Sequence, residues 1–532
     1  MWGPELTDRL IGDFSLACLD RNLKTLHLAR DHHGTGQMYF HQRGDTLCFS
    51  SNLAELLDQF EIALTPNKRQ LVQLLGALRI GQPEQTFYEG IFQIPPAHRL
   101  EFDGQRWRLF RYWDPRNTAP LDPASREAYD EAFREVLSTA VRCRLKNKTA
   151  PAIALSGGLD STAIAAIAAT QLAQDGLGLD SYTSVPLSEE PVPDNQLGNE
   201  RSLVVKMQAA FPTMRTHWLS EGAPGLLSAI DTTLDITRQP VFAAANCHWI
   251  VVLMQTLQSA GNDAVLTGQC GNATISWAGN RSQYLRGLWK HQGIGAWRDE
   301  ALSFRRAHNL SLATTARKML LPVLLGNEFV ENIKRRGLTR SSLEQATALG
   351  PALSKKMDAV NLARSSKILP LSRHHPGFRD SVMLSGVYSP NGVTASLAAA
   401  YGVELSDPTA DMRLIEFCYA LPESHYVSDG MNKRLVRGAM SGLVPDAILF
   451  NKKSGIQSSD IIPRLRREQH ELTAALDSLD QSPLACECLN LELMRSSFEK
   501  ALSDNSFATA SAARQVFMRG LMAGRFLQRF EV

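Results

Sequence analysis

Apolar and polar positions are arranged differently in the two parts of the chain. In residues 1–115, short apolar runs separated by charged or glycine-containing turns predict strands at 14–19, 26–29 and 46–50. Helical spacing interrupts these runs at 65–78. The first part is therefore predicted to be rich in β-structure.

The rest of the chain alternates strand-like runs with helical spacing. Residues 116–125 are rich in Pro, Asn, Asp and Ser, as expected of a linker, and helical spacing follows at 127–145. Apolar strand-like runs then recur at 151–155, 180–185, 214–219 and 263–266. Alternation of this kind is typical of a parallel sheet, which binds ligands at the carboxyl ends of its strands.

These patterns predict an α/β protein with two domains. A β-rich domain is expected at 1–118, and a parallel-sheet domain with helical additions at 126–532, the latter mostly helical over 280–375. A chain of 532 residues is long enough for both domains to bury sizeable cores.

Composition excludes several classes of partner. The net charge of +2 creates no global field for nucleic acid or an anionic membrane, so neither is expected to bind. Basic clusters at 334–336 and 464–467 are interpreted as solvated helix faces. No apolar run approaches ~18 residues, and the opening residues lack the pattern of a signal peptide. The eight cysteines are scattered without zinc or disulfide spacing, which favours a reducing cytoplasm.

The most informative stretch follows the apolar run that ends at Leu155. The residues after it are Ser156, Gly157, Gly158, Leu159, Asp160 and Ser161, and an alanine-rich helical segment comes next. A glycine turn between a strand and a helix directs backbone N–H groups and the positive helix end to one point, which suits a phosphate. Asp160 is placed to hold Mg²⁺ against phosphate oxygens. A tight turn with a capping Asp is the alternative.

A second apolar strand ends in a small polar turn. This turn contains Thr267, Gly268, Gln269 and Asn272, which is the geometry expected of a loop that backs a nucleotide. We therefore assign Thr267 and Gly268 to the same phosphate site. The turn resembles a loop of the asparagine synthetases whose Asp helps to hold Mg²⁺, and Asn272 stands at the position of that Asp. The resemblance implies that Asn272 offers Mg²⁺ only a neutral oxygen, so metal binding must rely mainly on Asp160.

The hexapeptide at 156–161 resembles the pyrophosphate loop of ATP pyrophosphatases, and its flanks resemble the asparagine synthetase superfamily. The resemblance implies cleavage of ATP between its α- and β-phosphates and transfer of AMP to a carboxylate, with ATP and Mg²⁺ required. It places Glu200, near a helix start, in the ATP site. The segment 451–456 resembles a family motif whose Lys faces the acyl-adenylate, which makes Lys453 the catalytic candidate and Lys452 the alternative.

The β-rich part resembles the amidotransferase domain of the same superfamily, an Ntn sandwich. Position 2 is Trp2, where that family carries its nucleophilic Cys, and the segment at 11–14 matches a stretch deep inside the family domain. We therefore expect a shortened domain that cannot hydrolyse glutamine and serves as a structural or peptide-docking remnant. Cys18 is the nearest thiol, and its apolar surroundings predict a buried core residue.

Three ligase types fit the resemblance. A glutamine-dependent asparagine synthetase is disfavoured by Trp2 and by the neutral Gln269 and Asn272, and a β-lactam synthetase remains an alternative. The tracts 268–279 and 407–414 most resemble the lasso peptide macrolactam synthetases, or lasso cyclases. That resemblance implies a ribosomal precursor peptide as substrate, with a leader-peptide protease and a leader-binding protein as possible partners. A non-catalytic ATP-binding protein is the remote alternative.

Overall fold

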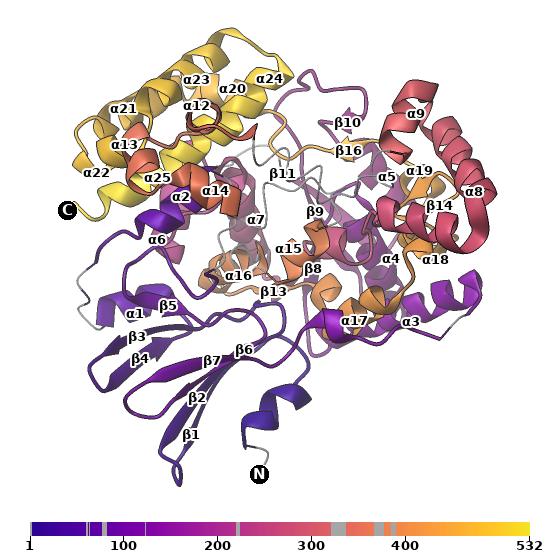
Figure 1. Ribbon diagram of the computed structural model, residues 1–532, viewed down its shortest axis with the longest axis horizontal. Helices are drawn as coiled ribbons and strands as arrows, with labels where there is room; N and C mark the ends of the chain where they lie inside the picture. Colours follow the sequence, from indigo (N-terminus) through magenta and orange to yellow (C-terminus); the bar gives the residue numbers. More distant parts are fainter. Residues whose placement is uncertain are drawn as a thin grey trace.

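The computed structural model describes the chain from residue 3 to residue 531 (Figure 1). Within that span it leaves out residues 60, 61, 63, 77–81, 123, 220–223, 321–336, 366–376 and 385–389. Two antiparallel sheets occupy the N-terminal part, a parallel sheet lies at the centre, and the last helices pack together on one side (Figure 1). The predicted α/β fold class is confirmed.

The N-terminal part is a sandwich of two antiparallel sheets. The first contains, in spatial order, β1 (Ser15–Asp20), β2 (Thr25–Arg30), β6 (His98–Phe102) and β7 (Trp107–Arg111). The second contains β4 (Thr46–Ser50), β3 (Tyr39–Arg43) and β5 (Ile91–Gln93). Leu28, Phe40, Ile94 and Leu100 are completely buried in the small core of this sandwich.

Two helices follow β4 in the chain, α1 (Leu53–Gln59) and α2 (Lys68–Gly76). Helix α2 begins later than the expected 65–78. Its start is fixed by Asn67, whose Oδ1 accepts hydrogen bonds from the backbone N–H groups of Arg69 and Gln70. An Asn at this position caps the first turn, so the periodic pattern before it does not become helix.

Strand β1 is an edge strand, and this overturns the prediction for Cys18. Among the described residues β1 pairs with β2 only, and Ala17, Cys18 and Leu19 are all exposed. An apolar run predicts burial only where both faces of the strand are covered, and an edge position leaves this one open. Cys18 is therefore a surface thiol and not a core residue.

The central sheet has five parallel strands. Their spatial order is β11 (Met214–Leu219), β9 (Leu179–Ser184), β8 (Pro151–Ala154), β12 (Ala264–Leu266) and β13 (Glu404–Ser406). Sequence order runs outward from β8 in one direction to β11 and in the other to β13, so the topology reverses between β8 and β12. The strand positions expected from the apolar runs are confirmed.

Helices pack on both faces of this sheet (Figure 1). They are α3 (Arg126–Leu145), α4 (Leu159–Gln174), α5 (Arg201–Ala210), α6 (Leu226–Thr237), α7 (Cys247–Ala260), α16 (Pro390–Ala400), α17 (Met412–Ala420), α18 (Arg434–Ala439) and α19 (Asp446–Leu449). Most of α4 is buried, as its alanine-rich sequence allows. Ser125 caps α3 through a hydrogen bond from the Ala128 N–H, which ends the predicted linker at the expected place.

The remaining elements extend the central domain. The helices are α8 (Arg281–His308), α9 (Leu312–Met319), α12 (Arg340–Ala346), α13 (Pro351–Lys356), α14 (Ala359–Ser365), α15 (Phe378–Leu384), α20 (Ile461–Arg467), α21 (Gln469–Leu479), α22 (Pro483–Cys488), α23 (Leu491–Ser503), α24 (Phe507–Ala512), the π-helical η7 (Ala513–Met518) and α25 (Arg519–Gln528). Short 3₁₀ turns are η1 (Gly3–Arg9), η2 (Pro115–Asn117), η3 (Ala244–Asn246), η4 (Gly271–Ala273), η5 (Pro408–Ala410) and η6 (Glu423–His425). Two pairs of very short strands complete the fold: β10 (Gln196–Leu197) with β16 (Ser454–Gly455), and β14 (Val427–Ser428) with β15 (Met431–Asn432).

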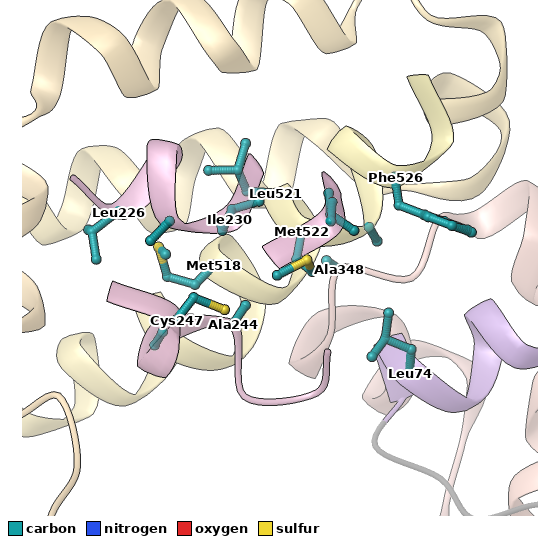
Figure 2. Packing of buried hydrophobic residues seen from close by; sticks show 14 of the residues in the cluster. Leu74, Leu226, Ile230, Ala244, Cys247, Ala348, Met518, Leu521, Met522 and Phe526 are labelled. Carbon is teal, nitrogen blue, oxygen red and sulfur yellow. The ribbon is translucent and has the colours of Figure 1, made fainter. Parts of the chain in front are cut away.

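The N-terminal part and the C-terminal helices share one hydrophobic core. Figure 2 shows Leu74 of α2 in the same cluster as Met522 and Phe526 of α25, together with residues of α6 and α7. Lys68 of α2 also forms an ion pair with Glu487, with 2.6 Å between Nζ and Oε2. The sandwich is therefore held to the rest of the molecule by buried apolar contact as well as by its linker.

Surface predictions met mixed outcomes. In the basic cluster at 464–467, Arg464 is buried and its Nε lies 2.9 Å from the buried Asp460 carboxylate, so the interpretation as a solvated face is wrong for Arg464. Arg467 is exposed, as predicted. The cluster at 334–336 lies outside the described residues.

All eight cysteines are free thiols, in agreement with their scattered spacing. In the part of the chain that is described, no helix combines the length and apolarity needed to cross a bilayer.

Candidate functional site

The predicted phosphate-binding residues lie where the topology of the parallel sheet reverses. Residues 155–161 follow β8, and residues 267–272 follow β12, its neighbour in the sheet. Ligands of open α/β sheets bind at this point because the loops after adjacent strands leave in opposite directions and form a crevice. The structure thus brings together two loops that lie more than a hundred positions apart in the sequence.

The loop after β8 is ordered by its own hydroxyl groups. The Ser156 N–H donates to Ser161 Oγ at 3.1 Å, and the Gly158 N–H donates to Ser156 Oγ at 3.2 Å. Leu155 is buried, and its carbonyl accepts a hydrogen bond from Thr183 Oγ1. The first intrahelical bond of α4 runs from the Thr162 N–H to the Gly158 carbonyl, so the N–H groups of the first turn have no intrahelical acceptor. That turn presents the positive helix end to a ligand.

The second loop packs directly against Asp160. A Cβ atom added to Gly271 would lie 2.4 Å from Asp160 Cγ, and one added to Gly268 would lie 3.0 Å from Asp160 Cβ. Both glycines are therefore required by the close approach of the Asp160 side chain. The predicted residues Asp160, Gly268 and Asn272 consequently lie at one place, with the carboxylate between the two loops.

A buried carboxylate, that of Asp407, forms hydrogen bonds that hold the second loop in place. Asp407, 1% exposed, accepts hydrogen bonds from the backbone N–H groups of Cys270 and Thr409, each at 2.9 Å. Burial raises the pKa of Asp407, whereas the Thr409 side chain and these N–H groups lower it. Asp407 belongs to the tract at 407–414, in which sequence analysis gave it no role of its own. Its bond to Cys270 fixes the turn that carries Gly271 and Asn272.

Lys433 is a site residue that sequence analysis left without a role. It precedes α18 in a left-handed conformation, with φ of 56°, and its Nζ lies 3.5 Å from both Asn272 Oδ1 and Ser276 Oγ. A lysine in this backbone region is uncommon, and such conformations cluster at functional sites. The ammonium group therefore adds positive charge beside the loop that packs on Asp160.

The loop that carries Lys453 is joined to the site by a short parallel pairing. The Ser454 N–H donates to the Asn195 carbonyl at 3.0 Å, and the Ile456 N–H donates to the Leu197 carbonyl at 2.9 Å. The Asn451 side-chain amide binds the backbone of Lys453 at both ends: Nδ2 donates to the Lys453 carbonyl, and Oδ1 accepts from the Lys453 N–H. The Lys453 side chain is exposed at this loop.

Lys452, the one-residue alternative, has a different environment. Its Nζ donates to the Ala307 carbonyl at the end of α8, at 3.0 Å. A lysine anchored to a neighbouring helix is poorly placed to reach a ligand. This contact favours Lys453 as the catalytic candidate.

Glu200 lies between the loops of Gly157 and Lys453. It occupies the N-cap position of α5 but its side chain makes no capping bond there. Burial raises the pKa of Glu200, and the nearby Gly157 N–H opposes that rise. The predicted placement of Glu200 with the ATP loop thus has a structural counterpart.

The residues present fit ATP and Mg²⁺. Thr267 Oγ1 is buried at the end of β12 and has no hydrogen-bond partner in the described part of the chain. A ligand oxygen at the switch point would satisfy it. No group of three metal-ligating side chains is found among the residues described. One carboxylate, such as Asp160, together with phosphate oxygens is nevertheless a usual environment for Mg²⁺.

Comparisons with known proteins identify the families that the chain resembles. Residues 132–523 match the family model described as asparagine synthase, and residues 1–113 match the glutamine amidotransferase domain. An asparagine synthetase [glutamine-hydrolyzing] 3 of Bacillus subtilis is 22% identical over 462 residues, which cover 85% of this chain and 68% of that protein. The amidase chry2 of Gibberella zeae is 27% identical over 276 residues, which cover half of this chain and 40% of that protein. A solved NMN synthetase from Francisella tularensis gives a TM-score of 0.19 at 17% identity over 30% of this chain and 59% of that one.

Proposed function

The chain belongs to the asparagine synthase family, and from this membership we propose that it closes a macrolactam in a ribosomal precursor peptide, as in lasso peptide biosynthesis. Its enzyme class is that of the ATP-dependent carbon–nitrogen ligases. The observation that carries the proposed chemistry is the packing of Asp160 against Gly268 and Gly271 where the sheet topology reverses.

The proposed reaction begins with activation of an acid. A carboxylate is a poor electrophile because its leaving group would be oxide. An Asp or Glu side chain of the peptide attacks the α-phosphate of ATP, which forms a mixed anhydride with AMP and releases pyrophosphate. The N-terminal amine of the same peptide then attacks the carbonyl carbon, and AMP leaves as the amide forms.

Each loop has a part in this sequence. The first turn of α4 and the loop at 156–161 bind the pyrophosphate through backbone N–H groups. Lys453 stabilises negative charge on the tetrahedral intermediate and on AMP, and one such donor typically contributes ~10²–10³ in rate. Lys433 adds a second cation at the phosphate end. Asp160 would hold Mg²⁺, with Asn272 as a neutral second ligand, and that ion offsets charge on the phosphate oxygens when bound.

The proposal that the amine comes from the peptide itself rests on two neutral residues in the second loop. Gln269 and Asn272 stand where asparagine synthetases carry acidic residues, so this site lacks charges used in the ordinary handling of ammonia and aspartate. An amine supplied by the substrate itself needs no glutaminase. The tracts at 268–279 and 407–414 support the macrolactam type over the β-lactam type.

The proposal includes partners and a compartment. The substrate is the core peptide after removal of its leader, so a leader-peptide protease and a leader-binding protein would act before it. Holding a folded peptide while its ring closes requires many positioning contacts, which a large protein can provide. The free thiols fit the cytoplasm, where such peptides are made.

The test is an assay of two products. Purified protein is given ATP, Mg²⁺ and a leader-cleaved candidate peptide, and pyrophosphate release is followed beside the peptide mass. We expect pyrophosphate release together with loss of one water from the peptide. Lys453→Ala should abolish both, and Lys452→Ala should leave both in place. Pyrophosphate release with aspartate and ammonia, but with no peptide acid, would contradict the proposal.

A further inference from the structure

The described part of the site contains one carboxylate that contacts two loops of different function. Glu200 packs against Gly157 of the loop proposed to bind pyrophosphate, and its carboxylate packs against Gly455 of the loop that carries Lys453. We infer that Glu200 is a positioning residue that sets Lys453 relative to the pyrophosphate loop. This inference rests on the function proposed above.

The first contact is with the pyrophosphate loop. A Cβ atom added to Gly157 would lie 3.2 Å from Glu200 Cβ and 2.7 Å from Leu203 Cδ1, so this loop packs tightly on the first turn of α5. The Gly157 N–H also favours the charged carboxylate, because it lowers the pKa that burial raises. The position of this loop therefore depends on Glu200 and Leu203 at the start of α5.

The second contact is with the loop of Lys453. A Cβ atom added to Gly455 would lie 2.5 Å from Glu200 Oε1 and 2.9 Å from Oε2, so both carboxylate oxygens lie against this glycine. Gly455 is two residues from Lys453, and it is paired with Leu197 in the register of β10 and β16. A change in the position of the carboxylate would be passed to the backbone that carries Lys453.

The surroundings leave Glu200 few alternative positions. Ser459 Oγ donates to the Gly198 carbonyl at 2.7 Å, and the Asn199 side chain bonds to the Arg201 N–H. Glu200 is thus held between a fixed segment and a fixed helix. A side chain that packs against two loops from such a position fixes the distance between them. Displacement of a catalytic group by ~1 Å can cost roughly 10² in rate.

The experiment separates positioning from binding. The variants Glu200→Ala, Glu200→Gln and Gly455→Ala are compared with wild type for ATP affinity and for the kcat of peptide-dependent pyrophosphate release. Glu200→Ala should lower kcat by roughly 10² with little change in ATP affinity. Glu200→Gln keeps an oxygen for Gly157 and the shape against Gly455, so it should recover most of the rate. Asp194→Ala, which removes an exposed carboxylate of the same segment, serves as the control.

A double variant makes the test specific to the contact. Gly455→Ala should lower kcat because its Cβ displaces the carboxylate, and Glu200→Ala with Gly455→Ala should be no slower than the slower single variant. Additive losses would mean that the two residues act separately and would overturn the inference. A wild-type kcat in Glu200→Ala would overturn this inference but not the proposed function. Absence of pyrophosphate release by the wild type would overturn both.

Discussion

Each half of the molecule has an aspartate in a glycine-containing turn, and the two turns have opposite designs. In the sandwich, the Asp31 carboxylate accepts hydrogen bonds from the N–H groups of its own loop, at His33, Gly34, Thr35 and Gly36. In the parallel-sheet half, the Asp160 side chain packs against a different loop, at Gly268 and Gly271.

The difference shows how a turn becomes a binding site. At Asp31 the anion that fills the ring of N–H groups belongs to the protein, so the turn is complete and buried. At Asp160 the hydroxyl groups of Ser156 and Ser161 order the loop, and the first turn of α4 still presents N–H groups without intrahelical acceptors. The first arrangement gives stability and the second provides a place for a ligand anion.

Exchange of the two carboxylates for amides should give the largest contrast. Asp160→Asn should reduce peptide-dependent pyrophosphate release by roughly 10² or more, because the negative charge that would bind Mg²⁺ is lost. Its unfolding midpoint should stay close to wild type. Asp31→Asn should instead lower the free energy of unfolding by about 2 kcal/mol, since bonds to a charged acceptor are weakened. Rates per folded molecule and denaturant midpoints distinguish the two, and a catalytic loss confined to Asp31→Asn would reverse the assignment.

A methyl group at the second loop tests the same site without removal of charge. Gly271→Ala places its Cβ 2.4 Å from Asp160 Cγ, so the carboxylate must move and pyrophosphate release should fall by roughly 10². Gly295→Ala in α8 is the matched control, because no heavy atom lies within 4 Å of the added carbon. Rates are measured at saturating ATP. Equal rates in both variants would show that Asp160 does not need this position.

The dependence of the sandwich on the shared core is tested at Leu74. Leu74→Ala creates a cavity between α2 and α25 and should cost about 2–5 kcal/mol in the free energy of unfolding. Because the cluster joins both halves, far-ultraviolet circular dichroism and ATP binding should be lost at the same lowered denaturant concentration. Leu64→Ala, at a side chain that is 41% exposed, should change little. Loss of sandwich signal with ATP binding intact would mean that the halves unfold separately.

Much of the fold could be predicted from sequence because local pattern determines it. The strands before Leu155 and after Asp263 end in polar, glycine-containing turns, and the helix after Ser161 is rich in alanine. The strand–turn–helix order of the candidate site could therefore be predicted from the sequence. Burial on two faces, which parallel strands require, leaves a strong signal in composition.

The residues that sequence analysis missed depend on tertiary contacts. Lys433 reaches Asn272 only because α18 packs beside the parallel sheet, and its left-handed conformation leaves no local signal. Arg464 looked like part of a solvated basic run, yet Asp460 lies one helical turn before it and pairs with it in the interior. The i, i+4 spacing of these opposite charges was a usable signal for their pairing, although it does not determine burial.

Acid should weaken the sandwich through buried histidines. Burial lowers the pKa of His33 to about 4, from an ordinary value near 6.5. Between these values the unfolded chain binds a proton that the folded chain does not, so stability falls as pH decreases, by about 2 kcal/mol at pH 5 for this group. His33→Gln should flatten the decline of the unfolding midpoint between pH 7 and pH 5, and His470→Gln, at an exposed site, should not. An unchanged slope in His33→Gln would exclude His33 as its source.

The smallest effect is expected at Cys18, because this thiol is exposed on the surface of the sandwich. Cys18 lies on the open strand β1 and lines a groove with Leu26, Phe49 and Phe102. Cys18→Ser should therefore change the free energy of unfolding by no more than about 0.5 kcal/mol and leave pyrophosphate release unaltered. Native-state labelling should show one fewer fast-reacting thiol, while Cys48→Ser, at a buried site, should leave the fast-reacting thiols unchanged. Release of glutamate from glutamine by wild type, abolished in Cys18→Ser, would instead make this edge strand a catalytic surface, and the sandwich would then be more than a support for the nucleotide loops.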